Sequence, residues 1–148
     1  MAAVRQAHVT WSGDLPTGKG HVSAATSGVF KDLEVSWARR SEADAQGKTS
    51  PEELLAASHA SCYAMALSNV LGQAGTPPGS LDVTATVTFD RVEGGFKVSS
   101  SALEVRGSVP GANEAEFQKA AETAKDTCPI SQALKGNVEL SAKATLEK

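Results

Sequence analysis

The feature that most constrains the fold is a long segment with few charges, residues 50–72, which predicts one apolar helix of about 20 residues. Ser50 is a good N-cap, Pro51 suits the first helical position, and Glu53 completes a capping box. A run rich in Gly and Pro, residues 75–79, ends the helix. A helix this apolar must be covered on several sides, and we expect a sheet and a partner subunit to cover it.

The same segment is a poor membrane span, because Ser58, His59, Ser61, Ser68 and Asn69 interrupt its apolar stretch.

The sequence before this helix indicates short strands broken by glycines, followed by a polar loop over residues 41–48. The extended stretches that we expect are His8–Trp11, His21–Ala25, Val29–Phe30 and Glu34–Ala38.

The sequence after the helix predicts a hairpin, a helix and a last strand. Val83–Phe89 alternates apolar residues with polar ones, and Gly94-Gly95 turns the chain into a second strand, Phe96–Val105. Asn113 caps a helix that Cys128-Pro129 breaks, and residues 130–135 form a short turn or helix. Residues 138–146 again alternate apolar and polar side chains, which predicts the last strand. This order predicts an α+β fold with mostly antiparallel sheets, in one domain that covers residues 1–148.

The charge balance excludes two classes of partner. The chain has 14 basic and 17 acidic residues, a net charge of −3 and no run of Lys or Arg. Nucleic acid and anionic membranes are therefore poor partners. Residues 1–10 have no apolar signal-peptide core, so we expect a cytoplasmic protein.

Two cysteines are the first candidates for chemistry. They are too few for a disulfide framework or a four-sulfur zinc site. In a reducing cytosol, a bridge between Cys62 and Cys128 would be catalytic or regulatory rather than structural. Cys62 lies in the apolar helix, where a lone cysteine is more often a small buried hydrophobe. Cys128 precedes Pro129, and as the N-cap of a following helix it would meet N–H groups that favour a thiolate.

The remaining candidates are a histidine and several charged residues. His59 and Cys62 are three positions apart, which suits thiolate activation or metal binding, but no third ligand is near, and a core histidine is the plainer interpretation. Glu52 lies in the first helical turn, and the capping box does not use it. Arg39 and Arg40 follow a strand end.

These features together resemble the OsmC/Ohr family of thiol-dependent hydroperoxide reductases, over nearly the whole chain. The matching motifs are W-S-G-D-L at residues 11–15, G-K-G at 18–20, P-E-E-L-L-A-A-S-H-A-S-C at 51–62, and C-P-I-S at 128–131. The first two motifs are more similar to the OsmC branch than to the Ohr branch.

The resemblance implies a fold and a set of site residues. The fold is an intertwined homodimer whose long helices are buried at its centre. Cys62 is the peroxidatic residue and Cys128 the resolving one, with Glu52 and an arginine beside them. The family's spacing from Trp37 selects Arg40, and the long polar loop leaves Arg39 as the alternative.

One geometric point shapes the role of Glu52. On a straight helix, Glu52 and Cys62 are about 15 Å apart along the axis and about 80° apart around it. They cannot touch directly, so we expect Glu52 to orient the arginine rather than act as a base on Cys62.

The activity that the resemblance implies is reduction of organic hydroperoxides to alcohols. Cys62 becomes a sulfenic acid, Cys128 closes a disulfide, and a dithiol reductant, such as a lipoyl group on another protein, reopens it. No metal or other cofactor is expected. Two alternatives remain open: a non-enzymatic thiol module that senses redox state or binds a ligand, and a His–Cys metal-binding protein.

Overall fold

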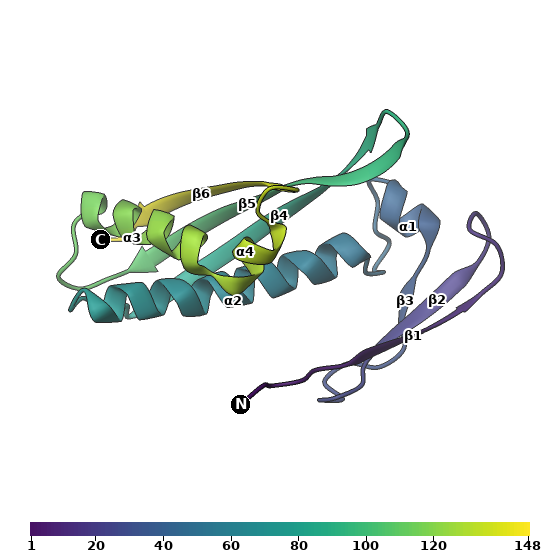
Figure 1. Ribbon diagram of the computed structural model, residues 1–148, viewed down its shortest axis with the longest axis horizontal. Helices are drawn as coiled ribbons and strands as arrows, with labels where there is room; N and C mark the ends of the chain where they lie inside the picture. Colours follow the sequence, from purple (N-terminus) through teal and green to yellow (C-terminus); the bar gives the residue numbers. More distant parts are fainter. The chain divides into compact units, whose positions relative to one another are not determined.

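The computed structural model describes residues 1–148, which divide into two compact units, residues 1–54 and 55–148. Figure 1 draws the first unit in purple and blue and the second in teal, green and yellow. The expectation of one domain over residues 1–148 stays a prediction. Mixed helices and sheets confirm the α+β class.

The first unit contains a three-stranded antiparallel sheet in the order β1-β2-β3. Its strands are β1 (Ala7–Ser12), β2 (Lys19–Ala24) and β3 (Leu33–Val35). Trp11 is paired with Gly20 across β1 and β2. A Cβ atom on Gly20 would lie 2.8 Å from the Trp11 ring, so only glycine lets the indole lie so close to the strand.

Two expected extended stretches of this unit differ in the structure. Residues 29–30 lie in the loop before β3 rather than in a strand. The pattern expected over residues 34–38 stops early, because helix α1 (Trp37–Ser41) begins at Trp37. The Ser36 hydroxyl accepts the backbone N–H of Arg39 at 3.3 Å, and this N-cap starts the helix.

Helix α2 (Pro51–Gln73) is the predicted long helix. The Ser50 hydroxyl accepts the Glu53 N–H at 3.1 Å, as the capping box requires. The other half of the box is replaced, because the Glu53 carboxylate instead accepts the Thr49 hydroxyl at 2.7 Å. Beyond the end of α2, Gly75 has a positive φ of 81°, which glycine adopts without strain.

Within the single chain, α2 is buried along one stripe. His59, Tyr63, Leu67 and Leu71 follow one another every four residues and are almost fully buried, whereas the side of Met65 is open, with 72% of that residue exposed. By length and composition α2 also meets the requirement for crossing a membrane, a test that the core helix of a soluble protein passes equally. The cover expected on several sides of this helix is therefore not complete in one copy of the chain.

The second unit contains a three-stranded sheet in the order β4-β5-β6. Its strands are β4 (Ser80–Val92), β5 (Gly95–Ser108) and β6 (Glu139–Leu146). β4 and β5 form the predicted antiparallel hairpin, with the turn at Glu93-Gly94, one residue earlier than expected. β6 pairs parallel with β5. A parallel pair needs a long crossover, which the two helices between β5 and β6 supply.

Those two helices are α3 (Glu114–Thr127) and α4 (Pro129–Leu134). Asn113 and Glu116 form the full predicted capping box at the start of α3. Cys128 has extended backbone angles, ends α3 and is the N-cap of α4, with Pro129 as the first helical residue. One cysteine thus occupies the junction of two helices.

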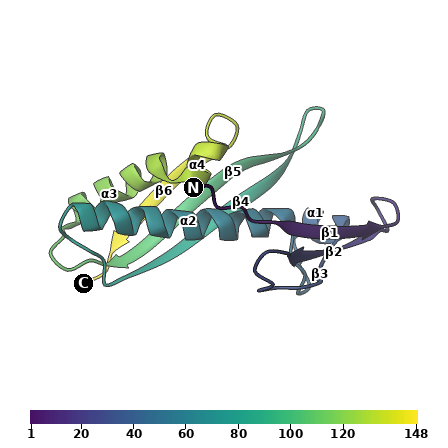
Figure 2. The same ribbon diagram turned by 60° about the horizontal axis from the view of Figure 1, so that its bottom comes forward.

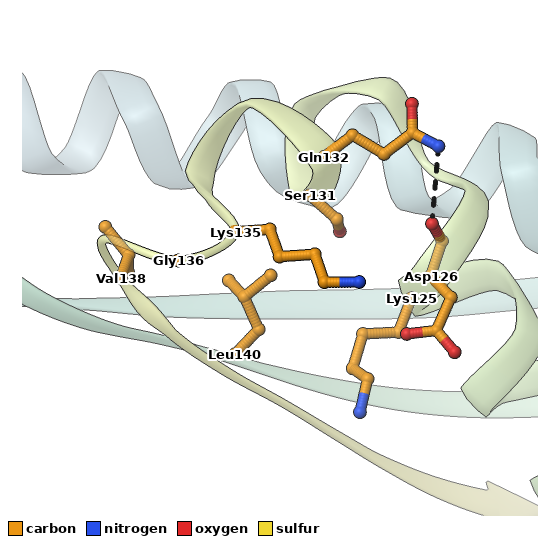
Figure 3. A pocket seen from close by; sticks show the side chains of 8 residues that line it. All are labelled: Lys125, Asp126, Ser131, Gln132, Lys135, Gly136, Val138 and Leu140. Atoms are coloured by element: carbon orange, nitrogen blue, oxygen red, sulfur yellow. Dashed lines mark hydrogen bonds between the residues drawn. The ribbon is translucent and has the colours of Figure 1, made fainter.

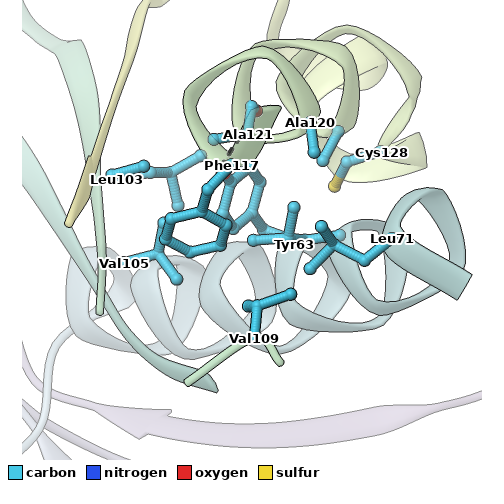
Figure 4. Close-up of a cluster of buried hydrophobic side chains, with 12 residues drawn as sticks. Tyr63, Leu71, Leu103, Val105, Val109, Phe117, Ala120, Ala121 and Cys128 are labelled. Atoms are coloured by element: carbon cyan, nitrogen blue, oxygen red, sulfur yellow. Dashed lines mark hydrogen bonds between the residues drawn. The ribbon is translucent and has the colours of Figure 1, made fainter. Parts of the chain in front are cut away.

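The core of the second unit lies between helices and sheet. Residues of α2, β5 and α3 form one cluster of buried side chains (Figure 4). Members of this cluster include Tyr63, Leu67, Leu71, Leu103, Val105, Phe117, Ala121 and Cys128. Figures 1 and 2 both show α2 and α3 running along the same sheet, β4-β5-β6.

Candidate active site

The fold brings the two cysteines into contact. The Sγ atoms of Cys62, on α2, and Cys128, at the α3–α4 junction, are 2.9 Å apart, and both cysteines are free thiols. Figure 4 shows the Cys128 side chain among the buried residues between α3 and α2. The Tyr63 hydroxyl donates to the Ala121 carbonyl at 3.0 Å, which ties α2 to α3 next to the pair. Two sulfurs so placed can close a disulfide with little movement.

The two thiols differ in exposure. Cys62 is partly exposed, whereas none of Cys128 is exposed. A bulky oxidant arriving from solvent can therefore meet Cys62 and not Cys128.

The second unit on its own shifts the two thiol pKa values apart. Burial, and then the hydrogen bond with Cys128, raise the pKa of Cys62. Burial also acts to raise the pKa of Cys128, but hydrogen bonding from the Cys62 thiol, the Ser131 N–H and hydroxyl and the Ile130 N–H outweighs it, so this pKa is lowered. These N–H groups belong to the first turn of α4, whose N-cap is Cys128, and N–H groups in that position favour a thiolate.

These shifts define where the charge of the pair resides. In the neutral pair the Cys128 thiol donates to the Cys62 sulfur. After one proton is lost, the pKa order leaves the charge on Cys128, and Cys62 becomes the donor. The raised pKa of Cys62 means that burial and the contact with Cys128 disfavour a thiolate on Cys62 within the second unit.

His59 is a buried histidine with both ring nitrogens bonded. Its Nδ1 lies 2.6 Å from the Ser101 hydroxyl of β5, and its Nε2 lies 2.7 Å from the Ser131 hydroxyl of α4. Burial lowers the pKa of His59, which keeps the ring neutral at pH 7. The sequence predicted a core histidine, but it gave no sign of Ser101, which the hairpin brings in from 42 residues away.

The other two predicted site residues also meet, within the first unit. Arg40 donates from Nε and Nη2 to Oε1 of Glu52 at 3.0 and 2.8 Å, and Nε also lies 3.3 Å from Oε2. Only 7% of Glu52 is exposed. Arg39, the alternative, instead donates to the Glu42 carboxylate and to the Asp44 carbonyl, both at 2.8 Å. Arg40 is thus the arginine that Glu52 orients.

Arg40 also borders an apolar cavity of about 340 Å³ in the first unit. Trp11, Leu15, Trp37 and Leu54 are among its lining residues, and Arg40 is the one charged residue there. Such a cavity accepts a hydrocarbon group and places it beside a guanidinium.

A smaller cavity of about 200 Å³ lies beside α4 in the second unit (Figure 3). Ser131 lines it together with Lys125 and Lys135. Lys125 is paired with Glu122 at 2.8 Å.

No group of three or more His, Cys, Asp or Glu side chains is arranged to hold a metal ion. His59 has serine partners on both ring nitrogens rather than Cys62, so the i, i+3 pair of the sequence does not form a ligand pair.

Comparison with known proteins identifies the family. The sequence model of the family described as "OsmC-like protein" matches residues 42–143. This range includes three of the four predicted site residues, and Arg40 lies just before it. The chain belongs to the OsmC-like family. This OsmC-like protein is 44% identical over 135 residues to the protein named "Peroxiredoxin OsmC" of Escherichia coli K12, and the match covers 91% of each chain.

More distant relatives agree with this assignment. The "Organic hydroperoxide resistance protein" of Xanthomonas axonopodis pv. citri is 31% identical to the OsmC-like chain, over 84% of this chain and 87% of that one. The crystal structure of the organic hydroperoxide resistance protein OhrB of Bacillus subtilis superimposes with a TM-score of 0.74 at 28% identity, covering 95% of this chain and 98% of that one. The higher identity to the OsmC relative accords with the branch that the early glycine motifs indicated.

Proposed function

We propose that this OsmC-like protein is a thiol-dependent peroxidase that reduces organic hydroperoxides to alcohols. The observation that carries the proposal is the 2.9 Å contact between the Cys62 and Cys128 sulfurs. It occurs in a chain whose relatives are named as a peroxiredoxin and as organic hydroperoxide resistance proteins. Two thiols in contact can be oxidised to a disulfide and reduced again, as catalytic turnover requires.

Cys62 attacks the hydroperoxide. Its thiolate forms a bond to the distal peroxide oxygen, the O–O bond breaks, and the alkoxide leaves and takes up a proton as the alcohol. The products are the Cys62 sulfenic acid and ROH. The exposure of the two thiols supports this order, since Cys62 reaches solvent and Cys128 does not.

Arg40 supplies the cation that a Cys62 thiolate needs. Support comes from the pKa of Cys62, which burial and the hydrogen bond with Cys128 raise within the second unit despite the Ile130 N–H, which lowers it. Support also comes from the ion pair with Glu52, which holds the guanidinium fork in one orientation. The same cation stabilises the alkoxide as it leaves.

Cys128 then resolves the sulfenic acid. Its thiolate attacks the Cys62 sulfur, the S–O bond breaks, and the departing hydroxide takes up the proton that Cys128 gave to solvent and leaves as water. A dithiol reductant, such as a dihydrolipoyl group, reduces the disulfide and becomes a disulfide itself.

The peroxidase works as a homodimer in the cytoplasm. The open side of α2, with Met65 at its centre, supports a partner subunit that covers it. A pair of free thiols that must be reduced after every turnover supports a reducing compartment.

The test is consumption of cumene hydroperoxide with dihydrolipoamide as the reductant. The Cys62→Ser variant should lose turnover completely, and Cys128→Ser should reduce about one equivalent per chain and then stall. Ser61→Ala is the matched control, because Ser61 is an exposed neighbour on the same helix whose hydroxyl bonds only to backbone carbonyls of α2. Turnover by Cys62→Ser overturns the proposal. One equivalent consumed by the unaltered protein, with no second turnover, supports a redox sensor instead.

A further inference from the structure

Three buried polar side chains form a hydrogen-bonded line from the sheet to the helix that the resolving Cys128 caps. Ser101 Oγ is 2.6 Å from His59 Nδ1, and His59 Nε2 is 2.7 Å from Ser131 Oγ. Ser131 lies in the first turn of α4, whose N-cap is Cys128, and hydrogen bonding from its hydroxyl and N–H lowers the pKa of the Cys128 thiol. None of these residues is more than 1% exposed. Solvent therefore offers no alternative partner, and each proton in the line must be assigned within it.

The proton assignment has one solution when Cys128 is a thiolate. A thiolate only accepts, so the Ser131 hydroxyl must donate its one proton to the sulfur. The Ser131 oxygen can then only accept from His59, so Nε2 carries the ring proton. A neutral imidazole has one N–H, so Nδ1 must accept, and the Ser101 hydroxyl must donate to it. All three hydrogen bonds point toward the sulfur.

We propose that His59 is a positioning residue for the resolving cysteine, which acts through Ser131 by holding the Ser131 hydroxyl proton on the Cys128 sulfur. The inference rests on the proposed function, since it concerns the step in which Cys128 attacks the Cys62 sulfenic acid. Ser101 fixes the Nε2–H tautomer of His59, because its hydroxyl donates to Nδ1. If the ring flipped to the Nδ1–H tautomer, the Ser131 hydroxyl would donate to Nε2 instead and the sulfur would lose this donor.

The hydrogen-bonded line acts in two steps of the catalytic cycle, disulfide formation and disulfide reduction. When Cys128 attacks, a hydroxyl aimed at its sulfur favours the nucleophilic thiolate. When the disulfide is reduced at Cys62, the S–S bond breaks and Cys128 leaves with the electron pair, so the same hydroxyl stabilises the leaving thiolate. The line itself takes up no proton, because each hydroxyl and the ring keep the proton that they hold.

The titratable groups near this sulfur include Cys62 and Tyr63 from α2, and Glu122 of α3 acts on Tyr63. Lys125 and Asp126 of α3 line the cavity next to Ser131. The β5 member of the line, Ser101, does not titrate. A change in the titration of Cys128 on removal of the serine or the histidine is therefore traceable to the line.

The first experiment reads the tautomer in the unaltered reduced protein by nitrogen NMR of the imidazole. We expect the proton of His59 on Nε2 at a pH high enough for Cys128 to be a thiolate. A proton on Nδ1 under that condition overturns the inference, and this measurement needs no variant to fold.

The second experiment uses variants in the Cys62→Ser background, where thiolate absorbance in the ultraviolet follows Cys128 alone. Ser131→Ala and His59→Leu should raise the titration midpoint of Cys128 by about one pH unit, and Ser131→Thr, which keeps the hydroxyl, should restore it. Ser100→Ala is the matched control, because Ser100 is next to Ser101 and faces the other side of the sheet. Midpoints equal to that of the control overturn the inference.

The third experiment separates the two steps of the cycle in the protein with both cysteines. In a single turnover, Ser131→Ala should slow disulfide formation about tenfold, while loss of the hydroperoxide keeps its rate. If the unaltered protein consumes no hydroperoxide, the proposed function fails. If it does and Ser131→Ala closes the disulfide at the unaltered rate, only the role of His59 and Ser131 fails.

Discussion

Arg40 and Glu52 form an ion pair in which one guanidinium edge meets one carboxylate, with Nη2–Oε1 at 2.8 Å and Nε–Oε1 at 3.0 Å. The pair joins α1 to the first turn of the helix that carries Cys62. Glu52 is nearly buried, and its carboxylate is used for orienting Arg40 rather than for capping α2, which Ser50 performs.

This geometry predicts that the two neighbouring arginines behave differently on substitution. Arg40→Lys keeps the charge but loses the planar fork, and we expect kcat/KM for cumene hydroperoxide to fall about tenfold or more. Arg39→Lys, whose parent side chain bonds to Glu42 and Asp44, should keep the original value. Equal losses in the two variants would show that the choice of Arg40 is wrong.

The negative charge of Glu52 should be required for full activity. Glu52→Gln keeps the shape of the side chain and removes the anion that holds Arg40, so we expect a loss of about tenfold to a hundredfold in kcat/KM. The control is Glu53→Gln, one residue along the same turn, because Glu53 is exposed and bonds only to Thr49 and to the Ser50 cap. A kcat/KM unchanged in the Glu52→Gln variant would contradict the role of Glu52 in orienting Arg40.

The packing of the second unit predicts a stability difference between two glycines near the ends of β4 and β5. A Cβ atom on Gly107 would lie 2.6 Å from the Phe117 ring, so Gly107→Ala overpacks the core and should cost about 1–3 kcal/mol of unfolding free energy. Gly79→Ala meets its nearest atom at 3.4 Å and should change stability by less than about 0.5 kcal/mol. Urea unfolding of both variants gives the comparison, and equal costs would contradict the predicted packing.

His59 predicts a pH dependence of stability. Burial lowers its pKa in the folded protein below the ordinary 6.5, so below about that pH the unfolded chain binds a proton that the folded protein does not. The free energy of unfolding should therefore fall as the pH drops below about 6.5, by up to about 1.4 kcal/mol per pH unit from this group.

The measurement for this pH effect is the urea midpoint at several pH values. His59→Gln should lose this part of the slope, whereas His21→Gln, at an exposed position in β2, should keep it. The same slope in both variants would show that His59 does not cause it.

Local features of the chain were predictable from the sequence. The start of α2 at Pro51, the capping box of Asn113 and Glu116, the β4–β5 hairpin and the helix break at Cys128 all follow from residues a few positions apart. Propensity, capping and turn chemistry act over that range, so the sequence carries them directly. The prediction of an extended segment up to Ala38 is wrong, because the Ser36 cap starts α1 at Trp37.

The sequence also carried the four candidate residues of the site, through their motifs. It could not choose between Arg39 and Arg40 on physical grounds, because both follow the same strand and both are ordinary surface types. The choice comes from which guanidinium the turn after β3 directs toward Glu52.

Only the tertiary structure decided the contacts between distant segments. The 2.9 Å approach of two sulfurs 66 residues apart, the parallel pairing of β5 with β6, and the two serines on His59 depend on how α2, α3 and the sheet pack. Burial of the whole core determines that packing rather than any short stretch of it, since hydrophobic burial is not directional. The sequence alone therefore specified which groups are available for chemistry, and the packing of the chain specified which of them meet.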